Sequence, residues 1–401
     1  MDQPTSNRWL LPDGVDELLP EAAWRVEQYR RAFMDCCKAW GFELVDPPLI
    51  EYLESLLAGS GETMDLQTFK LVDQHNGRAM GVRADMTPQV ARIDAHCLQR
   101  DVPNRFFYTG SVLRARTDGF GGSRSPRQFG AELFGHAGPE SDIEIIRLML
   151  AALEQALGEI PERLLDLGHV GVYRGIVDTL GLDAIREAQL FAAVQRGSIP
   201  DIKQLLSQTT LVNVSDEQAF EMLSGFMRLQ GDETILTDAK ALLKHANVAA
   251  TDALVNLQQI INAIKTSHPK VRINIDLADL HGYRYHTGVL FAAYTPDGVE
   301  LARGGRYDAI GAAFGHARPA TGFSGDLKRV IDTTNTRVST AVAGVFVPWA
   351  VHDDALVKVQ TLRDAGERVV VELPGSGSTA QNSNCDRMLQ QLDSDWVLTP
   401  V

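Results

Sequence analysis

Long apolar runs, a secretion signal and metal-type cysteine spacing are all missing from this sequence. No run reaches the ~18 apolar residues needed to cross a bilayer, and the opening residues, MDQPTSNRWLLPDG, contain no basic segment followed by an apolar one. The four cysteines, Cys36, Cys37, Cys97 and Cys385, include no pair with the spacing of a zinc site. We therefore expect reduced thiols in a cytoplasmic protein, with no membrane partner, no metal and no cofactor.

Basic residues are also scarce. The chain has 38 Lys and Arg against 52 Asp and Glu, and its formal net charge is -14. Affinity for nucleic acid depends mainly on cations that neutralise phosphates, so this balance argues against a nucleic-acid partner, although a local basic groove would be compatible with it. A length of 401 residues with 44% hydrophobic and 22% charged residues is typical of two or three globular domains.

Hydrophobic periodicity and turn residues outline the first part of the chain. They predict, in order, a helix at 21–40, a strand at 42–50, a hairpin at 67–83, strands at 104–116 and 128–135, and a helix at 141–157. Pro47 and Pro48 cannot donate ladder hydrogen bonds. The strand that contains them is therefore expected to be an edge or interface element.

The second part changes character twice. Residues 172–268 are rich in Ala, Leu and Gln at helical spacing, which predicts a helical insertion. Strand patterns return at 271–298, and a glycine-rich segment at 301–310 leads to a strand and helix at 319–333. After a polar linker, a small α/β piece is predicted with strands at 343–350, 368–374 and 395–400 and helices at 354–366 and 385–392.

Several polar residues in the strand regions form candidate binding groups. Gln128 and Glu132 are four apart, which places both on one face of a strand. An amide and a carboxylate there could hold a polar ring with one donor and one acceptor, such as imidazole. Arg114 lies in an alternating strand, and its planar fork suits a carboxylate or phosphate. A solvent-facing arginine and a polar surface stripe are the simpler alternatives.

Two further pairs suit an amino acid. Asp85 and Thr87 combine a charge with a hydroxyl, as an ammonium group requires, and a turn or cap aspartate is the simpler alternative for Asp85. Tyr285 and Tyr307 could each give an apolar wall with a polar tip, or could each be an ordinary core tyrosine.

Five segments together resemble the class II aminoacyl-tRNA synthetases, and specifically the histidyl enzyme. In chain order they are the strand around Pro48, VRADMTPQVAR, FFYTGSVLRAR with RQFGAELFG, HGYRYHTG, and GGRYD with PATGFSGDLKR. The resemblance covers residues 9–333 apart from the helical insertion. It implies an α+β fold: an antiparallel sheet flanked by helices, with the small-molecule site on the sheet.

The resemblance also assigns roles to the candidate residues. Asp85 and Thr87 would hold the ammonium group of histidine, although Asp85 is one methylene shorter than the family's glutamate. Arg114 would hold the carboxylate or an α-phosphate. Gln128 and Glu132 would bind the side chain, and Tyr285 and Tyr307 would flank it.

The sequence departs from the synthetase pattern mainly at residues that the family uses to activate the amino acid with ATP. His281 stands where the family has the arginine that stabilises α-phosphate charge, and a loss of that cation costs several kcal/mol of transition-state stabilisation. Arg284 replaces an aspartate, and Arg116 replaces the glutamate that contacts adenine. Arg329 matches the arginine that binds the γ-phosphate, and a structural role is equally open for it. His281, His286 and Arg329 are further candidates for the pocket.

The residues expected to bind the amino acid largely match the synthetase pattern, whereas those expected to activate it do not. In this combination the chain resembles the regulatory subunits of the short-form ATP phosphoribosyltransferase. LPDGVDELLP near the start, the SRSPRQFGAELFG form of the second motif and the reduced C-terminal piece support this. The resemblance implies a class II synthetase-like core at 1–333 with its insertion, and a small α/β domain at 334–401. It also implies no catalytic residue, a self-dimer through the core, L-histidine as ligand, and a hetero-octamer with a separate catalytic subunit. Its role would be activation and feedback regulation in the first step of histidine biosynthesis.

Other functions stay open from the sequence. A working histidyl-tRNA synthetase would need an arginine at 281 and a basic surface. A histidine:adenylate-forming ligase is compatible with Arg114 and Arg329. A stand-alone histidine-binding regulator is the third alternative.

Overall fold

The structure, a computed structural model, divides into two compact units, Met1–Asn335 and Thr336–Val401, which are considered separately. His281 and Arg284 lie outside the residues that it describes. The described residues are 9–59, 62–117, 122–157, 163–211, 213–280, 282–283, 285–333, 344–349, 353–393 and 395–401.

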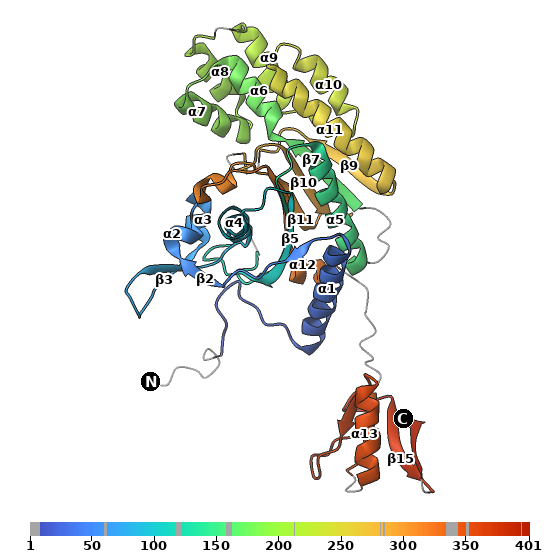
Figure 1. Cartoon of the computed structure of the whole chain (residues 1–401). Coiled ribbons are helices and arrows are strands. Elements are labelled where there is room, and N and C mark those ends of the chain that lie inside the picture. Colours follow the sequence, from blue (N-terminus) through green and yellow to red (C-terminus); the bar gives the residue numbers. More distant parts are fainter. Residues whose placement is uncertain are drawn as a thin grey trace, which may run out of the picture. The chain divides into compact units, whose positions relative to one another are not determined.

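A large sheet organises the first unit (Figure 1). In the described part of the chain it has nine strands, and neighbours are antiparallel except at β1–β5 and β7–β9. From edge to edge the strands are β1(Glu43–Leu44), β5(Asn104–Ser111), β6(Arg127–Phe134), β12(Ala320–Asp326), β11(Glu300–Arg306), β10(Val289–Tyr294), β7(Arg163–His169), β9(Val271–Asp276) and β8(Gln230–Gly231).

The register of the central strands decides which side chains reach each face. Glu132 of β6 lies opposite Phe106 of β5 and Gly322 of β12. Because side chains alternate along a strand, Gln128 and Glu132 share one face, while Phe129 belongs to the core on the other. A shift of one residue would exchange the two faces, so the packed core fixes the position of Glu132.

Three helices cover the apolar face of this sheet: α1(Pro20–Ala39), α5(Pro139–Leu157) and α12(Leu327–Asp332). The helix predicted at 21–40 is confirmed as α1, whose buried residues recur every three or four positions. Phe33 is fully buried and packs edge-on against Phe129 at 5.0 Å between ring centroids. Such aromatic pairs add about 0.5–1.5 kcal/mol beyond area burial.

Smaller elements lie on the opposite face of the sheet. They are the antiparallel strands β2(Ile50–Tyr52), β4(Ala79–Val82) and β3(Phe69–Val72) with the helices α2(Leu53–Leu56), α3(Glu62–Gln67), α4(Thr87–Arg92), η2(Ile93–Leu98) and η3(Ile310–Phe314). The hairpin predicted at 67–83 is confirmed as β3 and β4. Met86 and Val90 of this layer pack with Phe106 and Tyr108 of β5.

The single strand predicted at 42–50 is wrong. The chain forms the short edge strand β1 and then β2, with the two prolines between them. The carbonyl of Pro47 accepts from Arg83 Nη1 at 2.5 Å, and that of Pro48 accepts from Gln89 Nε2 at 2.8 Å. Side chains therefore satisfy the backbone where proline interrupts a ladder.

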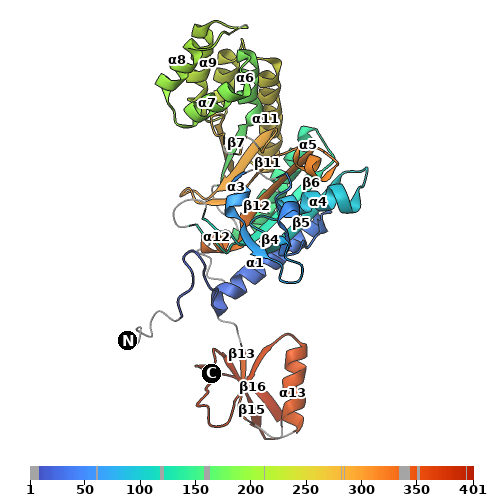
Figure 2. The same ribbon diagram turned by 90° about the vertical axis from the view of Figure 1, so that its left-hand side faces the viewer.

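Helices gather at the end of the sheet that carries β7 and β9 (Figures 1 and 2). They occupy the range expected to be an insertion, and α11 packs along α6 and α5. The helices are α6(Val170–Leu180), α7(Ala184–Gln195), α8(Ile199–Ser207), α9(Asp216–Phe226), α10(Ile235–Leu242) and α11(Val248–Ser267).

His169 joins the sheet to this helical group. It ends β7 and caps α6, its Nδ1 accepting the Gly171 N–H at 3.0 Å. Burial, aided by the charges of Arg306 and Arg174, lowers the pKa of His169 to about 4. Protonation would remove the cap acceptor and bury a charge, so the folded protein requires a neutral imidazole.

We expect this histidine to make the protein sensitive to acid. Because its folded pKa lies below the ordinary value of 6.5, its contribution is present above pH 6.5 and lost as the pH falls towards 4. The shift corresponds to about 3 kcal/mol at most. Urea unfolding between pH 7 and 4 should show a smaller loss for His169→Asn, because asparagine caps without titrating. His75→Asn, at an exposed turn, is the control. Equal losses in wild type and His169→Asn would contradict this role.

The second unit is a four-stranded sheet with one described helix, α13(Asp353–Asp364). Its strands, in sheet order, are β14(Arg368–Val371), β13(Gly344–Val347), β15(Arg387–Leu392) and β16(Asp395–Pro400). The helix predicted at 385–392 is wrong, because β15 pairs with β16 over its whole length. Leu, Gln and Met favour helix locally, but burial of Leu389 and the ladder to β16 outweigh that preference.

No helix in the described ranges combines the length and apolar character required to cross a membrane.

Candidate functional site

Four of the candidate residues come together on the face of β6 that carries Glu132. Gln128 Nε2 donates to Asp85 Oδ1 at 2.8 Å, and Gln128 Oε1 accepts from the Met86 N–H at 2.9 Å. The Thr87 N–H donates to the same Asp85 oxygen at 2.9 Å. The turn that starts α4 is thus fastened to the strand that carries Glu132.

Glu132 is the centre of the site and is 1% exposed. Thr87 Oγ1 and the Tyr108 hydroxyl donate to its Oε1 at 3.0 and 2.9 Å, and the Tyr307 hydroxyl donates to its Oε2. Burial raises the pKa of Glu132 well above its usual range. A carboxylate in such a place gains from any further donor or positive charge that a ligand brings.

Tyr285 and Tyr307 form the aromatic side of this site. Their rings stack with centroids 5.3 Å apart and planes inclined by 25°. Tyr307 is 3% exposed, and Tyr285 is partly buried. Tyr285 precedes β10 and Tyr307 follows β11. These two strands pair in the sheet, which brings the two rings together.

Arg114 lies just beyond β5 on the side of the turn that carries Asp85. Its Nε is 3.5 Å from the carbonyl oxygen of Ala84, the residue before Asp85. Both side chains are partly exposed, unlike that of Glu132. A cation and an anion at this end could face the carboxylate and ammonium groups of an amino acid.

The three further candidates have different outcomes. His286 packs behind Tyr285 with ring centroids 5.2 Å apart, and its Nδ1 is 3.2 Å from the carbonyl oxygen of Gly282. Burial lowers its pKa to about 4. Arg329 is half-exposed on α12, with Nη1 4.0 Å from Glu300 Oε1, and the structure does not join it to the group around Glu132. The prediction for His281 lies outside the described residues.

The sequence interpretation missed two residues that shape the site. Tyr108 supplies a hydroxyl to Glu132, and it could have been found because it alternates with Phe106, which lies opposite Glu132. Arg306 is 7% exposed and holds Asp142 and Asp308 at 3.0 and 3.2 Å, directly before Tyr307. Its charge gave no signal, because a buried arginine cannot be distinguished from a surface one by pattern.

Two glycines make room for the Glu132 carboxylate and the Tyr108 hydroxyl. A Cβ at Gly322 would lie 1.6 Å from Glu132 Oε2 and 2.7 Å from the Ala131 carbonyl oxygen, and one at Gly130 would lie 2.5 Å from the Tyr108 hydroxyl. Both positions face the same side as Glu132. The close approach of strands around the carboxylate therefore depends on the absence of side chains there.

Gly322→Ala is expected to displace Glu132 and to destabilise the first unit by about 1–3 kcal/mol, as overpacking does. Urea unfolding and the crystal structure of the variant would measure both effects. Gly225→Ala in α9 is a matched control, since its added methyl meets only the flexible end of Leu242. A Gly322→Ala protein as stable as wild type, with Glu132 unmoved, would show that the contact is not tight.

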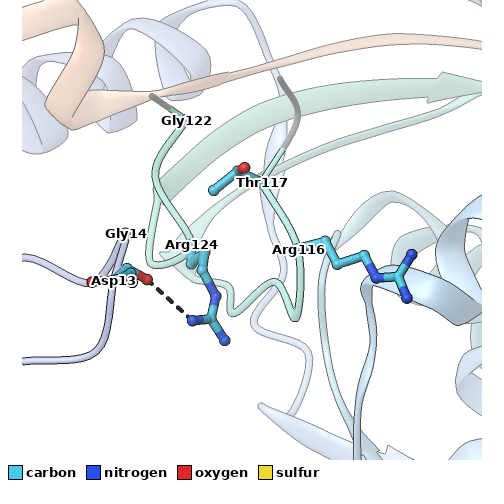
Figure 3. A pocket seen from close by; sticks show the side chains of 6 residues that line it. All are labelled: Asp13, Gly14, Arg116, Thr117, Gly122 and Arg124. Atoms are coloured by element: carbon cyan, nitrogen blue, oxygen red, sulfur yellow. Dashed lines mark hydrogen bonds between the residues drawn. The ribbon is translucent and has the colours of Figure 1, made fainter. Parts of the chain in front are cut away.

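An open cavity of about 440 Å³ lies beside the segment after β5, away from the residues around Glu132 that are described above (Figure 3). Its lining residues are Asp13, Gly14, Arg116, Thr117, Gly122 and Arg124. Arg124 Nη1 donates to the Asp13 carbonyl at 3.1 Å, while the Arg116 side chain extends in another direction. Arg116, expected to have replaced an adenine contact, is exposed here.

Comparisons with known proteins agree on one family. The histidyl-tRNA synthetase profile matches residues 14–330, and the profile of the ATP phosphoribosyltransferase subunit HisZ C-terminal domain matches residues 342–399. The chain is 51% identical to an ATP phosphoribosyltransferase regulatory subunit from Thioalkalivibrio sulfidiphilus, over 99% of each chain. It is 48% identical to one from Alkalilimnicola ehrlichii, over 98% of each chain.

Solved structures agree on the fold. A protein from Bacillus halodurans, described as an ATP phosphoribosyltransferase regulatory subunit/histidyl-tRNA synthetase, superposes with a TM-score of 0.80 and 25% identity, covering 97% of this chain and 99% of that one. A histidyl-tRNA synthetase from Nostoc has a TM-score of 0.74 at 18% identity, covering 98% and 97%. The fold is therefore that of the class II aminoacyl-tRNA synthetases, as the sequence motifs predicted. Because about half of its residues are identical to those of these relatives over nearly the full length, the chain belongs to the family of ATP phosphoribosyltransferase regulatory subunits.

Proposed function

We propose that the residues around Glu132 form a pocket that binds L-histidine. The observation that carries the proposal is the buried Glu132 carboxylate, which three hydroxyl groups surround and two stacked tyrosines border. An imidazole N–H can donate to this carboxylate while its flat ring packs against the tyrosine faces. An aliphatic side chain would add no donor to this buried carboxylate, so the site favours a flat side chain with a donor.

The other end of the pocket supports an amino-acid ligand. Asp85 and Arg114 carry opposite charges and are both partly exposed beside the Glu132 group. In our proposal Asp85 and Thr87 face the ammonium group, and Arg114 faces the carboxylate. Gln128 fixes the orientation of Asp85 through its 2.8 Å hydrogen bond and completes the polar wall.

The family name of the relatives supports a regulatory rather than a catalytic role. In our proposal this chain forms a dimer through its synthetase-like core and a hetero-octamer with a separate short-form catalytic ATP phosphoribosyltransferase chain in the cytoplasm. It activates that chain in the first step of histidine biosynthesis and transmits inhibition by histidine. Linkage then requires histidine to bind the inhibited assembly more tightly than the active one, typically by about 1–3 kcal/mol.

Calorimetric titration of the isolated chain with L-histidine, repeated with the catalytic chain present, tests this function. We expect one site per chain in both titrations, with a different affinity in the complex, and copurification of the two chains. Absence of histidine binding would refute the ligand. Histidine-dependent exchange of pyrophosphate into ATP by this chain alone would instead favour an adenylate-forming ligase, and binding without association would favour a stand-alone regulator.

A further inference from the structure

The segment that carries Tyr285 lies between the pocket and the helical insertion. On the pocket side, the Tyr285 ring stacks on Tyr307. Thr287 Oγ1 donates to Asp308 Oδ2 at 2.9 Å and accepts from the Asp308 N–H at 3.0 Å. This side of the segment is therefore attached to the residues that follow β11.

On the other side, α6 of the insertion holds the same segment through Arg174. Its Nη2 donates to the carbonyl oxygens of His286 and Tyr283 at 2.7 and 3.3 Å, and its Nη1 lies 3.5 Å from that of Thr287. The Val170 N–H, at the start of α6, donates to the Gly288 carbonyl at 3.1 Å. One guanidinium thus gathers the carbonyl groups on both sides of Tyr285.

Tyr283 extends the connection into the interior of the insertion. It is 8% exposed, and its ring stacks on Phe191 of α7 at 5.2 Å and meets Tyr173 of α6 edge-on at 5.0 Å. Its hydroxyl donates to Glu187 Oε1 at 3.0 Å. Two residues before Tyr285, the chain is therefore embedded in the insertion's own core.

These contacts give Arg174 a geometric task. A guanidinium holds several acceptors in a fixed plane, and hydrogen bonds from a charged donor are stronger than neutral ones. If the segment moved, Arg174 would leave several carbonyl groups without a donor. We infer that Arg174 is a positioning residue that sets the Tyr285 wall of the pocket and couples the insertion to occupancy of that pocket. The identity of the ligand as L-histidine rests on the proposed function.

Coupling between two sites is reciprocal. A ligand that packs on Tyr285 restricts the segment, and through Arg174 and Tyr283 it restricts α6 and α7. Conversely, a partner that shifts these helices changes the affinity of the pocket. The insertion is thereby a route by which a second protein could sense the ligand.

Arg174→Gln tests the positioning role by calorimetry with L-histidine. We expect a loss of affinity of about tenfold, which is 1.4 kcal/mol, and partial recovery in Arg174→Lys, which keeps a charged donor. Arg186→Gln, which removes an exposed cation of α7 that pairs with Asp183 and reaches the Gln208 carbonyl oxygen, is the matched control and should bind as wild type. Tyr283→Phe, which keeps the ring but loses the bond to the Glu187 carboxylate, is a milder second variant and should lose about threefold, which is less than the full contribution of one hydrogen bond to a charged group.

Hydrogen exchange supplies a readout that needs no ligand. The amides of Tyr285 and His286 donate to the Gly282 carbonyl at 2.8 and 2.9 Å, and that of Thr287 donates to Arg306 at 2.7 Å. These amides should exchange faster in Arg174→Gln, because the segment is released locally. In wild type, histidine should also slow exchange in α6 and α7, and this effect should vanish in Arg174→Gln.

The affinity and exchange measurements distinguish the positioning role of Arg174 from the proposed binding of histidine. Unchanged histidine affinity and unchanged exchange in both Arg174→Gln and Tyr283→Phe would overturn the inference and leave histidine binding intact. If wild type fails to bind histidine, the proposed function falls, and exchange in the unliganded variants decides the positioning role. Faster exchange at 285–287 would then support it, and equal exchange would overturn it.

Discussion

Glu132→Ala is expected to reduce histidine binding by about ten- to a hundredfold in a protein that still folds. The substitution removes the acceptor of three hydroxyl groups, those of Thr87, Tyr108 and Tyr307, together with the proposed partner of the imidazole. A hydrogen bond to a charged group contributes about 1.5–3 kcal/mol, and one such loss already corresponds to one or two orders of magnitude in affinity. Calorimetry with L-histidine measures this effect directly.

The fold should tolerate this change better than the ligand does. Burial raises the pKa of Glu132, which means that the ionised carboxylate is destabilised where it lies. Removal of the carboxylate relieves the cost of burying its charge, but it leaves the three hydroxyl groups without their acceptor. Because these two effects oppose each other, the melting temperature should shift only modestly. Glu132→Gln keeps the shape without the charge and should also bind weakly. The control is Glu140→Gln, a largely exposed carboxylate on α5. Wild-type affinity in Glu132→Ala would refute the placement of the imidazole.

Arg306→Met is expected to destabilise the first unit by about 3–5 kcal/mol, because it leaves a buried carboxylate without its cation. The side chains of Arg306 and Asp142 are 8% and 1% exposed and lie 3.0 Å apart. Arg306 also donates to Ser141 Oγ at 2.7 Å and to the carbonyl groups of His136 and Gly138 at 3.1 Å. Urea unfolding monitored by tryptophan fluorescence measures the loss.

A double-mutant cycle makes this prediction specific. Asp142→Asn in the Arg306→Met background removes the orphaned charge, so the double variant should be more stable than the sum of the single effects predicts. Arg303→Met on the same strand breaks an exposed ion pair with Glu300 and should cost less than about 1 kcal/mol. Additive effects at Arg306 and Asp142 would show that the pair does not act as a unit.

The sequence predicted the regular parts of the core well, for physical reasons. The helix α1 and the strands β5 and β6 show strong periodicity, and the same alternation places Gln128 and Glu132 on one face. The motifs also predicted that distant segments lie in one site, which periodicity alone could not predict. The roles of these residues in histidine binding stay predictions.

The errors arose where tertiary contacts outweigh local preference. The helix predicted at 385–392 is β15, because its ladder to β16 exists only in the folded unit. The strand predicted at 42–50 is split by its prolines, whose carbonyl groups find side-chain donors far along the sequence. Tyr108 was missed because its role depends on the register with β6, which a single sequence does not state.

The glycines around Glu132 restrict how this pocket could change its preference for ligands. Gly130 and Gly322 already have the smallest side chain available, so substitution at either position can only narrow the space beside the carboxylate. Among the tyrosines that border the site, Tyr108 and Tyr307 donate to the carboxylate itself, so shortening either would enlarge the site at the expense of that contact. A descendant of this chain would therefore find it hard to accept a bulkier amino acid without giving up the acidic group at its centre.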